Sequence, residues 1–197
     1  MIGQFEIMSR CEKSSARTGK LHTIHGVIKT PAFMPVGTKA TVKTMSSQDL
    51  EDLDYDVILG NTYHLNDRPG AELIASHGGL HNFMSWKKPI LTDSGGYQVF
   101  SLSQINKITD LGVSFRSHSD GKELFIGPHE SMKIQSLLGS DIAMVFDECP
   151  PYPSDKGYVY KAVCRTIAWA KECKKYDNLK NQLVFGIIQG GIYQDLR

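Results

Sequence analysis

Three apolar runs in the chain each end on a side chain that can hydrogen-bond a flat, polar heterocycle. The runs and the residues that follow them are 89–92 before Asp93, 142–146 before Asp147 and 183–188 before Gln189. An ionised carboxylate accepts hydrogen bonds, whereas a glutamine amide both donates and accepts them. This set of residue types could therefore recognise the polar edge of a ring.

The same three runs predict strands. Short, continuous apolar runs rich in β-branched residues are typical of strands buried on both faces. In α/β folds the polar groups at the carboxyl ends of parallel strands are where the chemistry is placed. A single polar residue at a strand end can simply meet water, but three matching ends favour an active site.

Residues 92–98 carry the densest chemistry. The adjacent Gly95 and Gly96 let the backbone approach a ligand closely and expose its N–H groups, while Tyr97 offers a face on which a ring can stack. The segment is also compatible with a plain tight turn capped by Asp93. Tyr97 is compatible with an ordinary core aromatic as well.

The companions of this segment favour the functional interpretation. A guanine edge presents N1–H beside an exocyclic amine, and Asp93 or Asp147 could accept both hydrogen bonds. Gln189 could donate to a carbonyl such as guanine O6. Cys149 follows Asp147 closely and would line the pocket at most.

The elements that must position these residues divide into two parts. Residues 1–30 form a β-rich opening of short segments broken by glycines, which predicts small antiparallel strands that plug or flank the fold. Residues 31–197 form β/α units. The expected strands and helices are strand 31–36, helix 47–53 with Ser46 or Ser47 as N-cap, strand 56–61, a helix near 69–76 followed by Gly78 and Gly79, a strand to Asp93, a hairpin over 113–126 with Asp120–Gly121 as its turn, helix 128–138, a strand to Asp147, helix 158–176 and a strand to Gln189.

Alternating strands and helices, with strands too apolar to be edges, predict an α/β fold with a parallel sheet and helices outside. A barrel is favoured over an open sheet because no Gly-x-Gly-x-x-Gly opens a helix after a strand, and because polar residues recur at successive strand ends. About five units are visible, whereas a closed barrel of this kind needs eight. We therefore expect the chain to be the front part of a larger barrel domain.

Composition sets loose bounds. The chain has 197 residues, of which 41% are apolar and 22% charged, as in an ordinary globular protein. A formal charge of +1 singles out no class of partner, although a local basic patch could still contact RNA. No signal peptide or membrane span is visible. The four cysteines have no metal-ligand spacing, so we expect a reduced, cytoplasmic setting and no metal ligands; they are Cys11, Cys149, Cys164 and Cys173.

Five ordered motifs together carry a family resemblance along nearly the whole chain. They lie at residues 33–38 (FMPVGT), 59–65 (LGNTYHL), 91–98 (LTDSGGYQ), 146–149 (FDEC) and 186–191 (GIIQGG). In this combination the chain resembles tRNA-guanine transglycosylase, also called queuine tRNA-ribosyltransferase. Any one motif would be weak evidence, but the five in order are specific.

The resemblance implies an irregular (β/α)8 barrel of the TIM type with a zinc-binding insertion towards its C-terminal end. It implies a glycosyltransferase of queuosine biosynthesis that acts on the wobble guanine of tRNAs with a GUN anticodon. In two displacements an aspartate attacks C1′ of the ribose, guanine leaves, and a 7-deazaguanine such as 7-aminomethyl-7-deazaguanine replaces it. The target base must leave its stack. A homodimer of the full-length form, with no membrane association, completes the implied properties.

Residue by residue, Asp93 matches the family's general acid/base, which handles the proton of the leaving and incoming bases. Asp147 and Gln189 match the residues that read the base edge, and Tyr97 matches the aromatic residue that stacks on it. Ser94, Gly95 and Gly96 lie in the segment that encloses the base. The pair Glu148–Cys149 resembles the bacterial form, which favours the aminomethyl precursor.

The resemblance also shows what the chain lacks. The family's nucleophilic aspartate, its Cys and His zinc ligands and most of its tRNA-contacting surface have no counterpart in these 197 residues. We therefore expect the chain alone not to complete the exchange, and Asp93 does not fill the missing role. Two alternatives stay open: a non-catalytic nucleobase-binding subunit of the same fold, and a barrel glycosidase with paired carboxylates, which Gln189 and the two glycines suit less well.

Overall fold

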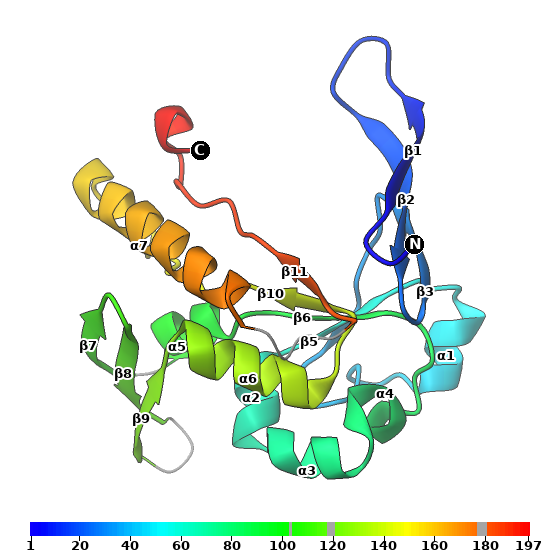
Figure 1. The fold of residues 1–197 in the computed structure, drawn as a ribbon, viewed down its shortest axis with the longest axis horizontal. Coiled ribbons are helices and arrows are strands. Elements are labelled where there is room, and N and C mark those ends of the chain that lie inside the picture. Colours follow the sequence, from blue (N-terminus) through cyan, green and yellow to red (C-terminus); the bar gives the residue numbers. More distant parts are fainter. Residues whose placement is uncertain (103, 118–120, 177–180) are drawn as a thin grey trace.

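The computed structural model describes residues 1–102, 104–117, 121–176 and 181–197. Its centre is a five-stranded parallel sheet in the order β11-β10-β6-β5-β4 (Figure 1). The strands are β4 (Val36–Gly37), β5 (Ile58–Gly60), β6 (Ile90–Thr92), β10 (Ile142–Met144) and β11 (Leu183–Phe185). Each parallel strand therefore lies beside the next parallel strand along the chain. This order is that of a barrel wall and not that of a doubly wound sheet, whose order reverses at a switch point.

The prediction of an α/β fold is confirmed, but the sheet is open. Among the described residues β4 and β11 each pair on one side only. The strand expected over 31–36 is wrong for most of its length, because only Val36 and Gly37 join the sheet. Pro35 has no N–H to donate to a neighbouring strand, and Phe33 is exposed.

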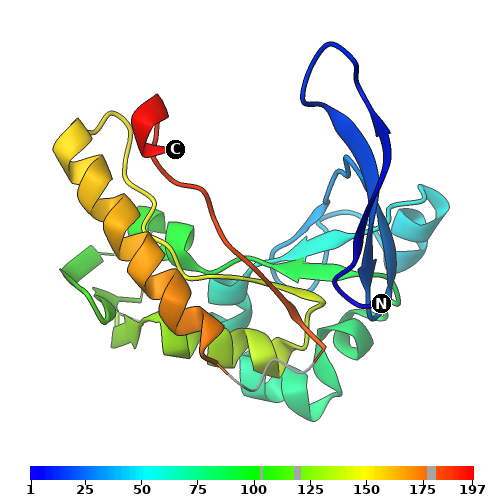
Figure 2. The ribbon, with the colours of Figure 1, turned by 45° about the horizontal axis from the view of Figure 1, so that its top comes forward.

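The opening residues form a separate antiparallel sheet of β1 (Phe5–Arg10), β2 (Arg17–Thr23) and β3 (Gly26–Thr30), as the glycine-punctuated sequence predicts. In Figure 2 its β1–β2 end projects away from the parallel sheet. Its other end packs onto the parallel sheet through one shared core cluster. The buried members of that cluster are Leu21, Ile28, Val57, Leu91 and Ile142.

A buried carboxylate also ties the two sheets together. Asp141, just before β10, accepts hydrogen bonds from the backbone N–H groups of His25 (3.0 Å) and Ile90 (2.9 Å). The ring of His81 also lies 3.0 Å from this carboxylate. Burial alone would raise the pKa of Asp141, but the hydrogen bonds from His81, Ile90 and His25 outweigh it and hold the pKa at about 2. The carboxylate is therefore ionised at neutral pH.

Four short helices surround the first two crossovers: α1 (Ser47–Asp52), α2 (Thr62–Asp67), α3 (Ala71–Ser76) and α4 (Gly79–Met84). Of the two predicted candidates, Ser46 is the N-cap of α1, and it forms a capping box with Asp49. The helix expected near 69–76 begins later, at Ala71, because Gly70 adopts a positive φ of 109°. Gly78 and Gly79 lie past its end, as predicted, but Gly78 is the N-cap of α4 and Gly79 is the first residue of that helix.

Between β6 and β10 the chain adds α5 (Gly96–Leu102) and an antiparallel sheet of β7 (Gln104–Thr109), β8 (Gly112–Arg116) and β9 (Glu123–Ile126). The hairpin of β8 and β9 is confirmed, while Asp120 of its predicted turn lies outside the described residues. Strand β7 was not predicted. Helix α6 (Pro128–Leu138) has the predicted bounds.

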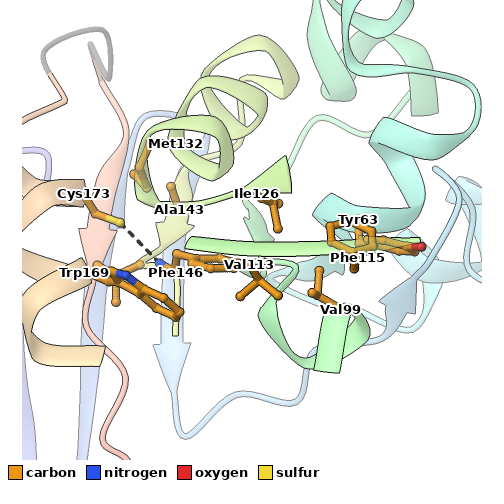
Figure 3. Packing of buried hydrophobic residues seen from close by; sticks show 11 residues of the cluster. Tyr63, Val99, Val113, Phe115, Ile126, Met132, Ala143, Phe146, Trp169 and Cys173 are labelled. Carbon is orange, nitrogen blue, oxygen red and sulfur yellow. Dashed lines mark hydrogen bonds between the residues drawn. The ribbon is translucent and has the colours of Figure 1, made fainter. Parts of the chain in front are cut away.

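The large core cluster lies where this added sheet meets α6 and α7 (Lys156–Lys174). Trp169 of α7 packs on Phe146, and the backbone N–H of Phe146 donates to Sγ of Cys173 at 3.3 Å (Figure 3). The helix expected over 158–176 is confirmed with both ends shifted towards the N-terminus, since Asp155 caps it. Cys164 and Cys173 both lie in it, one exposed and one buried. The 3-10 helix η1 (Gln194–Leu196) follows β11. Among the described residues, no helix has the length and apolar character needed to span a membrane.

The open sheet edges predict self-association. At one edge Phe33 is 73% exposed, and beyond the other edge Ile188 is 75% exposed. Unpaired strand edges with exposed apolar side chains favour pairing with another chain. We expect oligomers or poor solubility when the 197-residue chain is examined by light scattering. A monodisperse monomer with a cooperative thermal transition would show the prediction to be wrong.

Candidate active site

Asp93 lies directly after β6 and is fixed by the residues at the end of the neighbouring strand β5. Its Oδ1 accepts from the backbone N–H groups of Thr62 (2.9 Å) and Gly95 (3.1 Å), and its Oδ2 accepts from Nδ2 of Asn61 at 2.6 Å. The Thr62 hydroxyl donates to the carbonyl oxygen of Asp93 at 2.5 Å. The carboxylate is thus held by three donors at the carboxyl ends of two adjacent strands.

The environment of Asp93 disfavours its charge. Its pKa is raised to about 6: burial is the largest cause and the charge of Asp147 adds to the rise, while the hydrogen bonds from Thr62 and Gly95 act in the opposite direction. A carboxyl group with a pKa near 6 can both take up and release a proton close to neutral pH. This property is what a general acid/base requires.

Asp147 is buried near it, just beyond the end of β10, the strand that pairs with β6. Its Oδ1 accepts from Oγ of Ser94 at 2.7 Å, and its Oδ2 accepts from Nε2 of Gln189 at 2.6 Å. Burial raises the pKa of Asp147, and these two hydrogen bonds oppose the rise. The structure therefore brings Asp93, Asp147 and Gln189 together, with Ser94 between the two carboxylates.

Two of the three predicted strands end earlier than expected. Asp93 follows its strand directly, but β10 ends at Met144 and β11 ends at Phe185. Val145 extends the pairing by one bond, donating its N–H to the carbonyl oxygen of Phe185 at 3.0 Å. Asp147 and Gln189 therefore lie on the loops beyond their strands.

The segment after Asp93 leads into a helix. The sequence was also compatible with a plain tight turn there. Gly95 has a φ of 78°, and Gly96 opens α5, donating its N–H to Oγ of Ser94 at 3.0 Å. Tyr97 lies in the first turn of α5 with 61% of its surface exposed, so it is not a core aromatic. Its ring is available for stacking.

Cys149 is half-buried beyond Asp147. Burial raises the pKa of its thiol, and the charge of Asp147 raises it further, so the thiol stays protonated at neutral pH. The side chain of the preceding Glu148 contacts helix α7 instead. It is fully buried, accepts from the hydroxyl of Tyr158 at 2.8 Å and pairs with Arg165 of α7. This pair fixes the loop that carries Asp147 and Cys149.

A buried polar network supports the site from behind, and the sequence did not reveal it. The amide of Gln135 in α6 pairs with both backbone groups of Met144, accepting at 3.0 Å and donating at 2.9 Å. Oγ of Ser131, one turn earlier, donates to the carbonyl oxygen of Ser94 at 2.7 Å. Helix α6 thus holds both the end of β10 and the segment after Asp93. Asn61 was visible as a polar residue at a strand end, but its contact with Asp93 was not.

The described residues do not form the Cys and His zinc site that the family resemblance implies. Among them, the one group of three potential ligands within reach of a common ion is His25, His81 and Asp141, and it contains no cysteine. It also lies before β10, at the opposite end of that strand from Asp147. Within the part of the chain described, this group is therefore separate from the site around Asp93.

Gly96 has no room for a side chain. A Cβ there would lie 2.5 Å from the carbonyl oxygen of Asp147 and 2.8 Å from its Oδ1. We expect Gly96→Ala to push Asp147 away and to lower the free energy of unfolding by about 1–3 kcal/mol in urea denaturation. The control is Gly186→Ala, because a Cβ at Gly186 meets nothing within 4 Å. Equal effects of the two substitutions would contradict this packing constraint.

Comparison with known proteins shows the family of the chain. Residues 11–197 match the family model described as queuine tRNA-ribosyltransferase. Proteins of that name from Halothermothrix orenii and Shouchella clausii are 58% identical over 193 residues and 57% identical over 197 residues. A third, from Staphylococcus aureus strain JH9, is 56% identical over 194 residues. The alignments cover 98% of this chain but only 51–52% of those relatives, so the chain spans about half their length. The chain belongs to the queuine tRNA-ribosyltransferase family.

Proposed function

We propose that this chain carries the base-recognition half of a tRNA-guanine transglycosylase that exchanges the wobble guanine of GUN-anticodon tRNAs for a 7-deazaguanine. One observation carries the proposal: the partly buried Asp93 and the buried Asp147 lie close together beyond the ends of paired strands, with Gln189 bonded to Asp147. The printed names of the relatives support the reaction class. On this proposal residues 1–30 and 31–197 belong to one irregular (β/α)8 barrel domain.

Guanine fits the hydrogen-bonding capacity of the site. Its N1–H and exocyclic amine are donors, and a carboxylate accepts both. In the structure the Asp147 carboxylate accepts from Ser94 and Gln189 instead. A base that donates to Asp147 would replace the Gln189 amide, which then becomes able to donate to O6. Gln189 thus keeps Asp147 hydrogen-bonded until a base enters.

The remaining residues enclose the base. The exposed ring of Tyr97 stacks on it, and Ser94, Gly95 and Gly96 let the backbone approach its edge. Cys149 lines the pocket as a neutral thiol beside Asp147. The base of a tRNA must leave its stack to reach these groups. 7-Aminomethyl-7-deazaguanine shares guanine's N1–H and amine, so the same contacts would hold the incoming base.

Asp93 acts on protons in this proposal. With a pKa of about 6 it can give a proton to the departing guanine and take one from the incoming base. The attack on ribose C1′ belongs to a different aspartate, which has no counterpart in these residues. The zinc site implied by the resemblance lies outside them as well. We therefore assign base reading and proton transfer, and no nucleophilic step, to this chain.

Equilibrium binding of guanine tests the proposal. In titration calorimetry at neutral pH, Asp147→Asn should weaken guanine binding at least about tenfold, because a hydrogen bond to a charged acceptor contributes about 1.5–3 kcal/mol. Asp52→Asn, at an exposed position in α1, is the matched control and should bind like the wild type. Lack of guanine binding by the folded wild-type chain would contradict the proposal.

The pH dependence of the same binding reports on Asp93. Its raised pKa means that the carboxylate accepts hydrogen bonds above about pH 6 and becomes protonated below it. We expect guanine affinity to fall as the pH is lowered from about 8 to about 5, with a midpoint near pH 6. Asp93→Asn should bind weakly and without this midpoint. An unchanged midpoint in the variant would assign the titration to another group.

A further inference from the structure

A cluster of two imidazoles and one carboxylate lies at the end of the parallel sheet opposite to Asp93. Asp141 immediately precedes β10, His25 lies in the turn between β2 and β3, and His81 lies in α4. Nδ1 of His25 is 3.1 Å from Oδ1 of Asp141, and Nε2 of His81 is 3.0 Å from Oδ2. Three parts of the chain that are distant in sequence therefore direct potential ligand atoms at one point.

The spacing of these atoms suits one metal ion. The ligand atoms of the three residues all lie within 4.8 Å of one another. Ligand atoms bound to one tetrahedral zinc ion at about 2.0–2.2 Å are roughly 3–3.5 Å apart. The two measured nitrogen to oxygen distances fall in that range. Small movements of the side chains would therefore place all three around a common ion.

The chemistry of the ligands points to a borderline transition metal. Two neutral imidazoles and a carboxylate are ligands that zinc accepts, whereas calcium and magnesium prefer all-oxygen sites. The rings of His25 and His81 stack with centroids 3.7 Å apart, so the two potential nitrogen ligands are held next to each other.

The surroundings orient the carboxylate and leave a way in. The backbone N–H groups of His25 and Ile90 each donate to one oxygen of Asp141, which fixes the plane of the carboxylate. The side chains of Asp141 and His81 are buried or nearly so, but that of His25 is 37% exposed. An ion can therefore enter from the His25 side, where water would complete its coordination.

We propose that His25, His81 and Asp141 bind one divalent zinc ion that fastens the N-terminal antiparallel sheet to α4 and β10. In the metal-bound form, the nitrogen atoms that now face Asp141 present lone pairs to the ion, and each ring carries its proton on the other nitrogen. The role is structural, because the site lies at the amino-terminal side of the strands, away from Asp93. It is independent of the proposed base exchange.

Zinc binding by the untagged 197-residue chain tests the proposal. After removal of metal with a chelator, we expect one zinc per chain to be retained through gel filtration and measured by elemental analysis. Cobalt substitution should give the visible absorption of a tetrahedral nitrogen and oxygen site. Zinc should also raise the midpoint of thermal unfolding.

The variants locate the ion. His25→Ala removes a partly exposed ligand, so its fold should survive by circular dichroism while its zinc affinity falls at least about tenfold. His81→Ala should lower the zinc affinity in the same way. His77→Ala removes an exposed histidine at the end of α3 and should leave zinc binding unchanged. Two results would overturn the proposal: no zinc on the folded wild-type chain, which would leave a purely hydrogen-bonded cluster, or equal zinc binding by His25→Ala and the wild type.

Discussion

The structure depends on holding two carboxylates, the partly buried Asp93 and the buried Asp147, close together beyond the ends of two paired strands. Burial disfavours the charged forms of Asp93 and Asp147, and the charge of Asp147 further disfavours that of Asp93. Such groups are tolerated only when they are hydrogen-bonded. Backbone N–H groups at the start of α2 and α5, the amide of Asn61, the Ser94 hydroxyl and the Gln189 amide supply these bonds.

That requirement explains the surrounding structure. Helix α5 must begin at Gly96, because a side chain there would strike Asp147. Helix α6 must present Ser131 and Gln135 to the ends of the strands, since these residues hold Ser94 and Met144. At the opposite end of the sheet, the hydrogen bonds to Asp141 outweigh the effect of burial, so its pKa is low and the carboxylate is ionised. One carboxylate is thus stabilised as an anion, while Asp93 is kept close to its protonation point.

The sequence predicted what depends on local pattern. Helix α6 was found with its bounds because Pro128 opens it and Gly139 ends it with a φ of 68°. The three polar strand ends were recognised because apolar runs precede them. Strand 31–36 was overestimated because an apolar run was taken for a paired strand although two prolines interrupt it. Short helices α2, α4 and α5 were missed because each begins at residues whose types also suit turns.

Contacts between distant segments were beyond the sequence. No local pattern shows that the side-chain amide of Gln135 hydrogen-bonds the backbone of Met144. None shows that His25 and His81 both contact Asp141. The same holds for Asn61, whose cap of α2 is local but whose bond to Asp93 crosses between strands. The family motifs pointed to the residues that we propose read the base, and the geometry adds how each is held.

The most direct test of the base-reading site is an experimental structure of the chain with guanine bound. We predict that guanine N1–H and its amine donate to the carboxylates of Asp93 and Asp147, that the Gln189 amide leaves Asp147 for guanine O6, and that Tyr97 stacks on the ring. A structure in which guanine binds elsewhere and the 2.6 Å bond between Gln189 and Asp147 persists would contradict it.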